Sequence, residues 1–290
     1  TRQRPSLLGN TVSESDYVNV GIPAWELDFF GRIQSLKDAA LSQYLATEEA
    51  RKATQISLVA AVATGWLAVI ADEESLQITR DTLATREEGL KLSKLRFDNG
   101  VISEIDLRLA ESLAENARAT YAQQQRARMQ DENALALLLG SPVPPEAVQG
   151  GLGALDAVSP MADVPAGLPS DLLSQRPDIR QAEQQLLAAN ANIGAARANF
   201  FPRITLTATY GTASNELSGL FESGSKAWSF APALVLPIFD YGANSARLAS
   251  AWANRDIAVA QNEKSIQAAF REVADALAGR ATLDDELDAL

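Results

Sequence analysis

Residues 96–103 read RFDNGVIS, and their Asp98-Asn99-Gly100 segment is the one good turn signal within residues 24–141. Those residues contain no proline. Because proline interrupts helices, its absence over this length permits very long ones. The pattern predicts a helical hairpin, with one helix over residues 32–97 and the other over residues 103–139. At about 1.5 Å per residue the first helix would be roughly 100 Å long, which requires coiled-coil, solenoid or barrel packing.

The composition excludes several kinds of chemistry. The chain has 290 residues, no Cys and no His, and a formal net charge of −12. Disulfides, thiolate chemistry, the usual zinc and copper ligand sets and His-based catalytic triads are therefore absent. Carboxylate-only Mg²⁺ or Ca²⁺ sites and Lys chemistry stay open, but no ligand constellation supports them. We expect a protein that is not an enzyme, without cofactor or metal, and an acidic chain of this kind is a poor partner for nucleic acid.

Two runs have the period-2 pattern of strands. Hydrophobic residues alternate with threonines over residues 204–210, and residues 227–239 carry no charge. In the second run one parity is apolar and is predicted to face a membrane: Trp228, Phe230, Leu234, Leu236 and Ile238. The uncharged residues 17–25 predict another strand, and residues 6–12 a fourth. The commoner alternative is a soluble β-hairpin packed on helices.

The first predicted helix also contains an uncharged segment, residues 53–71, that is near the length of a membrane span. Its polar residues Thr54, Gln55, Ser57 and Thr64 argue against a transmembrane helix. That interpretation remains a minor alternative.

An internal repeat relates the two halves of the chain. LDFFG at residues 27–31 matches LPIF at residues 236–239, which is followed after two residues by Gly242. Each half then reads as a strand, a turn at glycine and a long helix. Past the insertion the offset is 211, which predicts a second hairpin turn near position 311, beyond Leu290. We therefore expect the chain to be a piece of a longer protein.

Seven blocks, spread over nearly the whole chain, resemble the TolC-like outer-membrane factors, and the OprM-like efflux lipoproteins in particular. They are WELDFFGR at residues 25–32, LPSDLL at 168–173, RPDIR at 176–180, ANANIGAAR at 189–197, FFP at 200–202, LPIF at 236–239 and EVADAL at 272–277. Together these blocks are specific, whereas any one alone would be weak.

The resemblance implies a mainly α fold with a small β part. Long helical hairpins would form a periplasmic α-barrel, and antiparallel strands would contribute to one β-barrel shared by a homotrimer in the outer membrane. It also implies passive, multidrug export linked to antibiotic resistance, with a periplasmic adaptor and an inner-membrane RND-type transporter as partners. The barrel would contact outer-membrane lipid, and the full-length protein would carry an N-terminal lipid anchor.

The same resemblance divides the chain into six segments. They are residues 1–30 as the first strand pair, 31–139 as the long hairpin, 140–176 as an irregular equatorial connector, 177–201 as a helix leading to the barrel, 202–240 as the second strand pair, and 241–290 as the truncated start of the second long helix.

The predicted hairpin turn resembles the periplasmic tip of the family, where subunits contact the adaptor. The residues implied for adaptor contact are Asn99, Gly100, Val101, Ile102, Ser103 and Glu104. Asp106 matches a position near the family's pore constriction. The alternative is an ordinary helix-hairpin turn in which Ser103 is the N-cap and the acids favour the helix dipole.

The rival function is that of a soluble coiled-coil interaction or scaffold protein. Long helices and a periodic repeat would suit it, but such a protein has no need for the uncharged strands. The sequence does not name the exported compounds, because in the resembled family the pump selects them.

Overall fold

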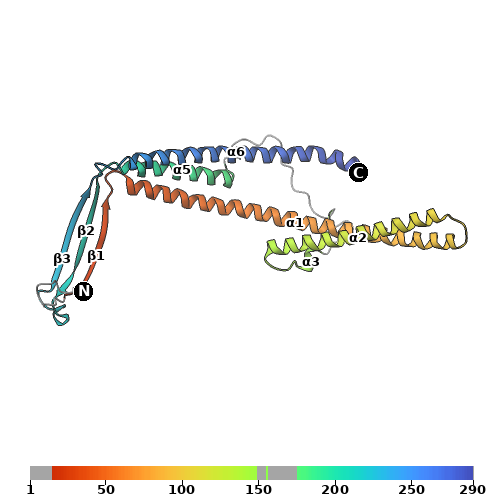
Figure 1. Ribbon diagram of the computed structural model, residues 1–290, viewed down its shortest axis with the longest axis horizontal. Coiled ribbons are helices and arrows are strands. Elements are labelled where there is room, and N and C mark those ends of the chain that lie inside the picture. The colour runs from red at the N-terminus through yellow and green to blue at the C-terminus, as the bar shows by residue number, and fades with distance from the viewer. Residues whose placement is uncertain (1–14, 149–154, 156–174, 290) are drawn as a thin grey trace. The chain divides into compact units, whose positions relative to one another are not determined.

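The computed structural model describes residues 15–148, 155 and 175–289 (Figure 1). The fourth strand predicted within residues 6–12 lies outside the described residues. The described chain is mainly helical with a small antiparallel sheet, as the sequence predicts.

Three strands form one antiparallel sheet in the order β1-β2-β3, and Figure 1 shows them side by side. They are β1 (Asp16–Leu27), β2 (Arg203–Ser214) and β3 (Lys226–Val235). The short 3₁₀ turn η1 (Leu217–Gly219) lies in the β2–β3 connection. Within the described residues, the outer edges of β1 and β3 have no paired strand.

The helices include the two predicted from the proline-free run. These are α1 (Arg32–Asp98) and α2 (Glu104–Leu139), which differ from the predicted bounds by one residue each. They are followed by the single-turn α3 (Pro145–Val148), then α5 (Pro177–Ala198) and α6 (Ala243–Ala289). Pro177 occupies the first turn of α5, where its missing N–H removes no helical hydrogen bond.

One prediction about the second strand run is wrong. β3 ends at Val235, so Leu236 and Ile238 lie in the turn that follows and not in the sheet. The pairing ends there because Arg203, the partner of Val235, is the first residue of β2. Both side chains are nevertheless exposed.

The chain forms two compact units, residues 1–50 with 169–290, and residues 51–168. In the first, α5 supplies most of the buried side chains, including Ile179 and Ile193, and it runs along α6 (Figure 1). Gly194 of α5 lies against the start of α1, because a Cβ there would be 2.5 Å from the Ser35 Oγ. A side chain at this position would force Ser35 to change its rotamer or to shift slightly.

The second unit packs α1 against α2. Val69 and Leu135 are its most buried large side chains. Trp66 donates its indole N–H to the carbonyl of Ala147 at 2.7 Å, which ties α3 to α1. An ion pair of 2.7 Å between Arg118 and Glu87 links the helices nearer the turn.

Much of the apolar surface of α1 is not covered. This helix contains an 18-residue window with a mean hydropathy of 1.7, so by length and composition alone it could cross a membrane. Ile56, Leu58 and Val59 are exposed. A core helix of a larger assembly has the same properties, because its apolar face is covered only when neighbours are present.

Candidate functional site

The sheet has one apolar face and one face of small and polar residues. The pairing register places Val20 opposite Tyr210 and Tyr210 opposite Trp228, so the apolar residues of three strands lie in rows. The rows comprise Val20, Ile22, Trp25 and Leu27 of β1, Ile204, Leu206, Ala208 and Tyr210 of β2, and Trp228, Phe230, Pro232 and Leu234 of β3. Of the predicted membrane-facing residues, Trp228, Phe230 and Leu234 therefore share this face, and all three are exposed.

A bulge keeps the apolar face continuous along β1. Ile22 pairs with Ala208 and Trp25 pairs with Leu206, so the register shifts between Ile22 and Trp25. Since successive side chains in a strand alternate, residues three apart would otherwise face opposite ways. The bulge at Pro23 puts both on the apolar side.

The opposite face is lined by hydroxyl groups and small side chains. The hydroxyls of Thr209 and Ser229 hydrogen-bond at 2.6 Å, and Thr207 donates its hydroxyl to the Pro23 carbonyl at 2.8 Å. Alternation of an apolar face with a polar face along every strand is typical of barrel walls between lipid and a water-filled lumen.

The hairpin turn is a Schellman motif. The Gly100 N–H donates to the Phe97 carbonyl and the Val101 N–H to the Arg96 carbonyl, both at 2.8 Å. Gly100 has a φ of 72°, a left-handed conformation that glycine adopts without strain. The Asn99 side chain donates to the Leu95 carbonyl at 2.7 Å. These contacts end α1 sharply and give the turn a defined shape.

A capping box starts the return helix. The Asp106 N–H donates to the Ser103 Oγ at 3.2 Å, and the Ser103 N–H donates to the Asp106 carboxylate at 3.1 Å. The Ser103 hydroxyl, and then its N–H, hold the pKa of Asp106 below its usual value. The carboxylate of Asp106 is thus engaged at the helix start, and a constriction lined by it remains a prediction. Glu104 is exposed and pairs with Arg108 at 3.2 Å.

Two apolar side chains protrude at the turn. Val101 is 70% exposed and Ile105 is 79% exposed, whereas Ile102 is half-buried. Ile105 was not among the predicted tip residues. Its signal in the sequence is an apolar residue between two acids, Glu104 and Asp106, at the second position of α2.

The two turns that join strand to helix have the same construction. Gly31 and Gly242 both have positive φ, of 71° and 81°. The carbonyl of each glycine accepts the first hydrogen bond of the helix that follows. The donors are the N–H groups of Ser35 and Ala246, both at 2.9 Å. All of these equivalences have the offset of 211 read from the sequence, so the repeat is a structural one.

Aspartates stabilise the starts of both helices that follow these turns. Asp28 accepts from the Gln34 N–H at 2.7 Å, and this backbone contact is the main reason that the pKa of Asp28 lies below its usual value. Asp240 accepts from the N–H groups of Gly242 at 3.0 Å and Asn244 at 2.8 Å. Acids at a helix N-terminus satisfy N–H groups that have no helical partner.

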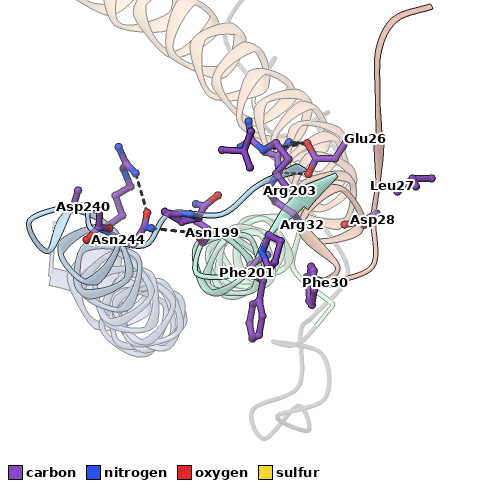
Figure 2. A pocket seen from close by; sticks show the side chains of 16 residues that line it. Glu26, Leu27, Asp28, Phe30, Arg32, Asn199, Phe201, Arg203, Asp240 and Asn244 are labelled. Carbon is purple, nitrogen blue, oxygen red and sulfur yellow. Dashed lines mark hydrogen bonds and ion pairs between the residues drawn. The ribbon is translucent and has the colours of Figure 1, made fainter. Parts of the chain in front are cut away.

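A pocket of about 400 Å³ lies where the strands meet these helices (Figure 2). We call it the junction pocket. Its lining residues come from the end of β1 through the start of α1, from the end of α5 through the start of β2, and from the end of β3 through the first turns of α6: Glu26, Leu27, Asp28, Phe30, Arg32, Ala198, Asn199, Phe201, Pro202, Arg203, Val235, Pro237, Asp240, Ala243, Asn244 and Arg247. This pocket could not be predicted from the sequence, because its residues are far apart in the chain.

Figure 2 shows Arg32 and Arg203 beside Glu26, and Phe30 near Phe201. Arg32 donates to both carboxylate oxygens of Glu26, which raises the pKa of the Arg32 guanidinium. Arg203 approaches the same carboxylate at 3.5 Å. The Phe30 and Phe201 rings stack with their centroids 4.6 Å apart.

An amide network forms another part of the wall. Asn244 is 5% exposed and donates its side-chain N–H to the Asn199 carbonyl at 3.1 Å. Its Oδ1 accepts from Arg247 at 3.0 Å. Because Asn244 is fixed from both sides, it holds the start of α6 against the end of α5.

Comparison with known families decides the relationship. The family described as outer membrane efflux protein matches residues 1–141 and 168–290. The chain belongs to this family.

Individual members of the outer membrane efflux protein family are similar over nearly all of the chain. It is 50% identical to the solvent efflux pump outer membrane protein SrpC of Pseudomonas putida over 97% of its own length, and 48% identical to the outer membrane protein OprJ of Pseudomonas aeruginosa over 96%. It covers 59% and 58% of those two proteins. The chain therefore spans about three fifths of the length of these relatives.

Solved structures of outer-membrane channels have the same fold. The open state of the MtrE outer membrane channel of Neisseria gonorrhoeae matches all of this chain with a TM-score of 0.87 and 44% identity, and the match covers 64% of that channel. A membrane protein from Pseudomonas aeruginosa matches with a TM-score of 0.89 and 47% identity, over 66% of its length.

Proposed function

We propose that the full-length protein is the outer-membrane channel of a tripartite efflux pump, a passive exit duct for drugs or other small molecules. The observation that carries the proposal is the sheet. All three described strands place large apolar residues on one face, and the other face carries mainly hydroxyl and small residues, with Glu26, Arg203 and Val235 at its helix end. A soluble protein would bury the apolar face, whereas here Trp228 and Phe230 are 75% and 55% exposed.

The sheet edges support a shared barrel. Strand edges with free N–H and C=O groups are not tolerated in lipid, and single-chain bacterial barrels have at least about eight strands. Three described strands and a predicted fourth are too few to close. We propose that three copies contribute their strands to one barrel, as a homotrimer with cyclic symmetry. The exposed apolar residues of α1 would be covered in the same assembly by helices of an α-barrel.

The hairpin turn is the proposed contact with a periplasmic adaptor. A rigid Schellman turn that presents the exposed Val101 and Ile105 suits a small apolar contact. We propose an inner-membrane RND-type transporter as the second partner, and an N-terminal lipid anchor on the full-length protein. The names of two relatives describe solvent and toluene efflux pumps, which suggests small apolar compounds among the solutes.

The test is to express the full-length parent protein in a Gram-negative strain that lacks its own efflux channels of this family. Membranes are separated by density, and accumulation of a fluorescent dye is measured with a matched adaptor and transporter present. We expect recovery in the outer membrane and lowered dye accumulation. Recovery in the soluble fraction would overturn the proposal and favour a coiled-coil scaffold instead.

A further inference from the structure

We propose that the junction pocket is a binding site for the anionic group, carboxylate or phosphate, of a small amphiphilic solute. The pocket has about 400 Å³, which is in the range of small-molecule sites. Three of its lining residues are arginines, brought together from α1, β2 and α6. Arginine presents its N–H groups in a planar fork that matches carboxylate and phosphate oxygens.

The acids of the junction pocket are already occupied by other donors. Asp28 and Asp240 accept backbone N–H groups at the starts of α1 and α6. Glu26 accepts two hydrogen bonds from Arg32, and its side chain is 15% exposed. Asp28 and Asp240 therefore stabilise the helix starts and Glu26 pairs mainly with Arg32, so none of the three is a close partner of Arg247.

Two guanidinium groups retain free donors. Among the described residues, Arg247 contacts only the amide oxygen of Asn244, which carries no charge. Arg203 has Glu26 as its ion-pair partner, at 3.5 Å, but that carboxylate is held more closely by Arg32. The side chain of Arg203 is 50% exposed. The remaining N–H groups of Arg203 and Arg247 are therefore open to an acceptor that carries negative charge.

Apolar groups make up much of the remaining wall. They come from Ala198, Phe201, Pro202, Val235, Pro237 and Ala243. An occupant with an anionic head and an apolar body would satisfy the arginines and cover this surface at the same time. A bare inorganic anion would pair with the arginines but would leave the apolar surface exposed.

The location of the site rests on the proposed function. Glu26 pairs with Thr205, and Arg203 pairs with Val235, so both lie on the face that carries Thr209 and Ser229. If that face lines the lumen, the junction pocket opens to the solute path and away from lipid. Three copies in a trimer would form a ring of such sites below the barrel.

The experiment measures binding of 4-fluorobenzoate to the detergent-solubilised full-length protein by ¹⁹F NMR line broadening. We expect Arg247→Gln and Arg203→Gln to weaken binding by about ten-fold or more, because each removes charged hydrogen bonds. Arg255→Gln is the matched control: it also removes an arginine from α6, but one that pairs with Asp256 and does not line the pocket. The neutral 4-fluorobenzamide should not bind, and inorganic phosphate should compete weakly.

Unchanged binding in Arg247→Gln, or equal binding of the benzamide, would overturn the proposal. Displacement of 4-fluorobenzoate in nanodiscs by phosphatidylglycerol but not phosphatidylcholine would also overturn it, because the pocket would then hold a lipid headgroup. Binding is measured without transport, so failure of export in cells would count against the proposed function and leave the site intact.

Discussion

Gly100 and Gly89 are both glycines of the long hairpin, but their backbone conformations differ. Gly100 has a φ of 72° in the Schellman turn, whereas Gly89 lies inside α1 in ordinary helical conformation. A Cβ at either position would meet no atom within 4 Å. The difference between them is therefore one of backbone conformation and not of space.

Alanine at the two positions should have opposite effects. Gly100→Ala is expected to destabilise the protein by about 1 kcal/mol, because a left-handed alanine is strained. Gly89→Ala is expected to stabilise it by about 0.5–1 kcal/mol through helix propensity. Thermal unfolding by circular dichroism measures both. Adaptor cross-linking should fall only for Gly100→Ala, and equal cross-linking in both variants would contradict a functional tip.

Some residue roles could be read from the sequence and others could not. Ser103 was predicted as the N-cap and Asp106 as an acid that favours the helix dipole, and the structure joins the two residues in a capping box. Arg32, Arg203 and Arg247 share a pocket only because a strand, a turn and a helix meet there. No local pattern connects these three arginines, so their shared pocket could not be predicted from the sequence.

At the scale of elements, the bulge in β1 determines which side chains share a face. A strict period of two would have placed Ile22 and Trp25 on opposite sides of the sheet. The bulge between Ile22 and Trp25 puts both side chains on the same face. The only sign of it in the sequence is Pro23. The helices were easier to predict, because the absence of proline and one strong turn fix α1 and α2. The end of β3 was missed, since the apolar alternation continues past Pro237 after the hydrogen bonding has stopped.

Substitutions on adjacent residues of β3 should distinguish the two faces of the sheet. Phe230→Arg places a charge on the apolar face, and in lipid this is expected to cost about 2–4 kcal/mol near mid-membrane. Ala231→Arg places the same side chain on the opposite face, where water would solvate it. Outer-membrane yield should fall strongly for the first variant and little for the second. Equal yields would show that this sheet does not face lipid.

At the scale of the whole molecule, the outer edges of β1 and β3, which have no paired strand among the described residues, are open to partner strands. If the barrel is shared as proposed, the full-length protein has no stable membrane form as a single chain.

Native mass spectrometry of the detergent-solubilised full-length protein should therefore give the mass of three chains. Gly89→Ala is a suitable control, because it alters α1 without touching the sheet. A mass equal to one chain, with the strands intact by circular dichroism, would contradict a shared barrel.

The exposed apolar face and open edges of the sheet also matter before assembly. If three copies share one barrel as proposed, a newly made copy would display Trp228, Phe230 and Tyr210 to water until two others arrive. Such a surface is prone to aggregation and is a target for holding chaperones and proteases. The number of working ducts in a cell would then depend steeply on the rate of synthesis, because copies that fail to find partners in time are degraded.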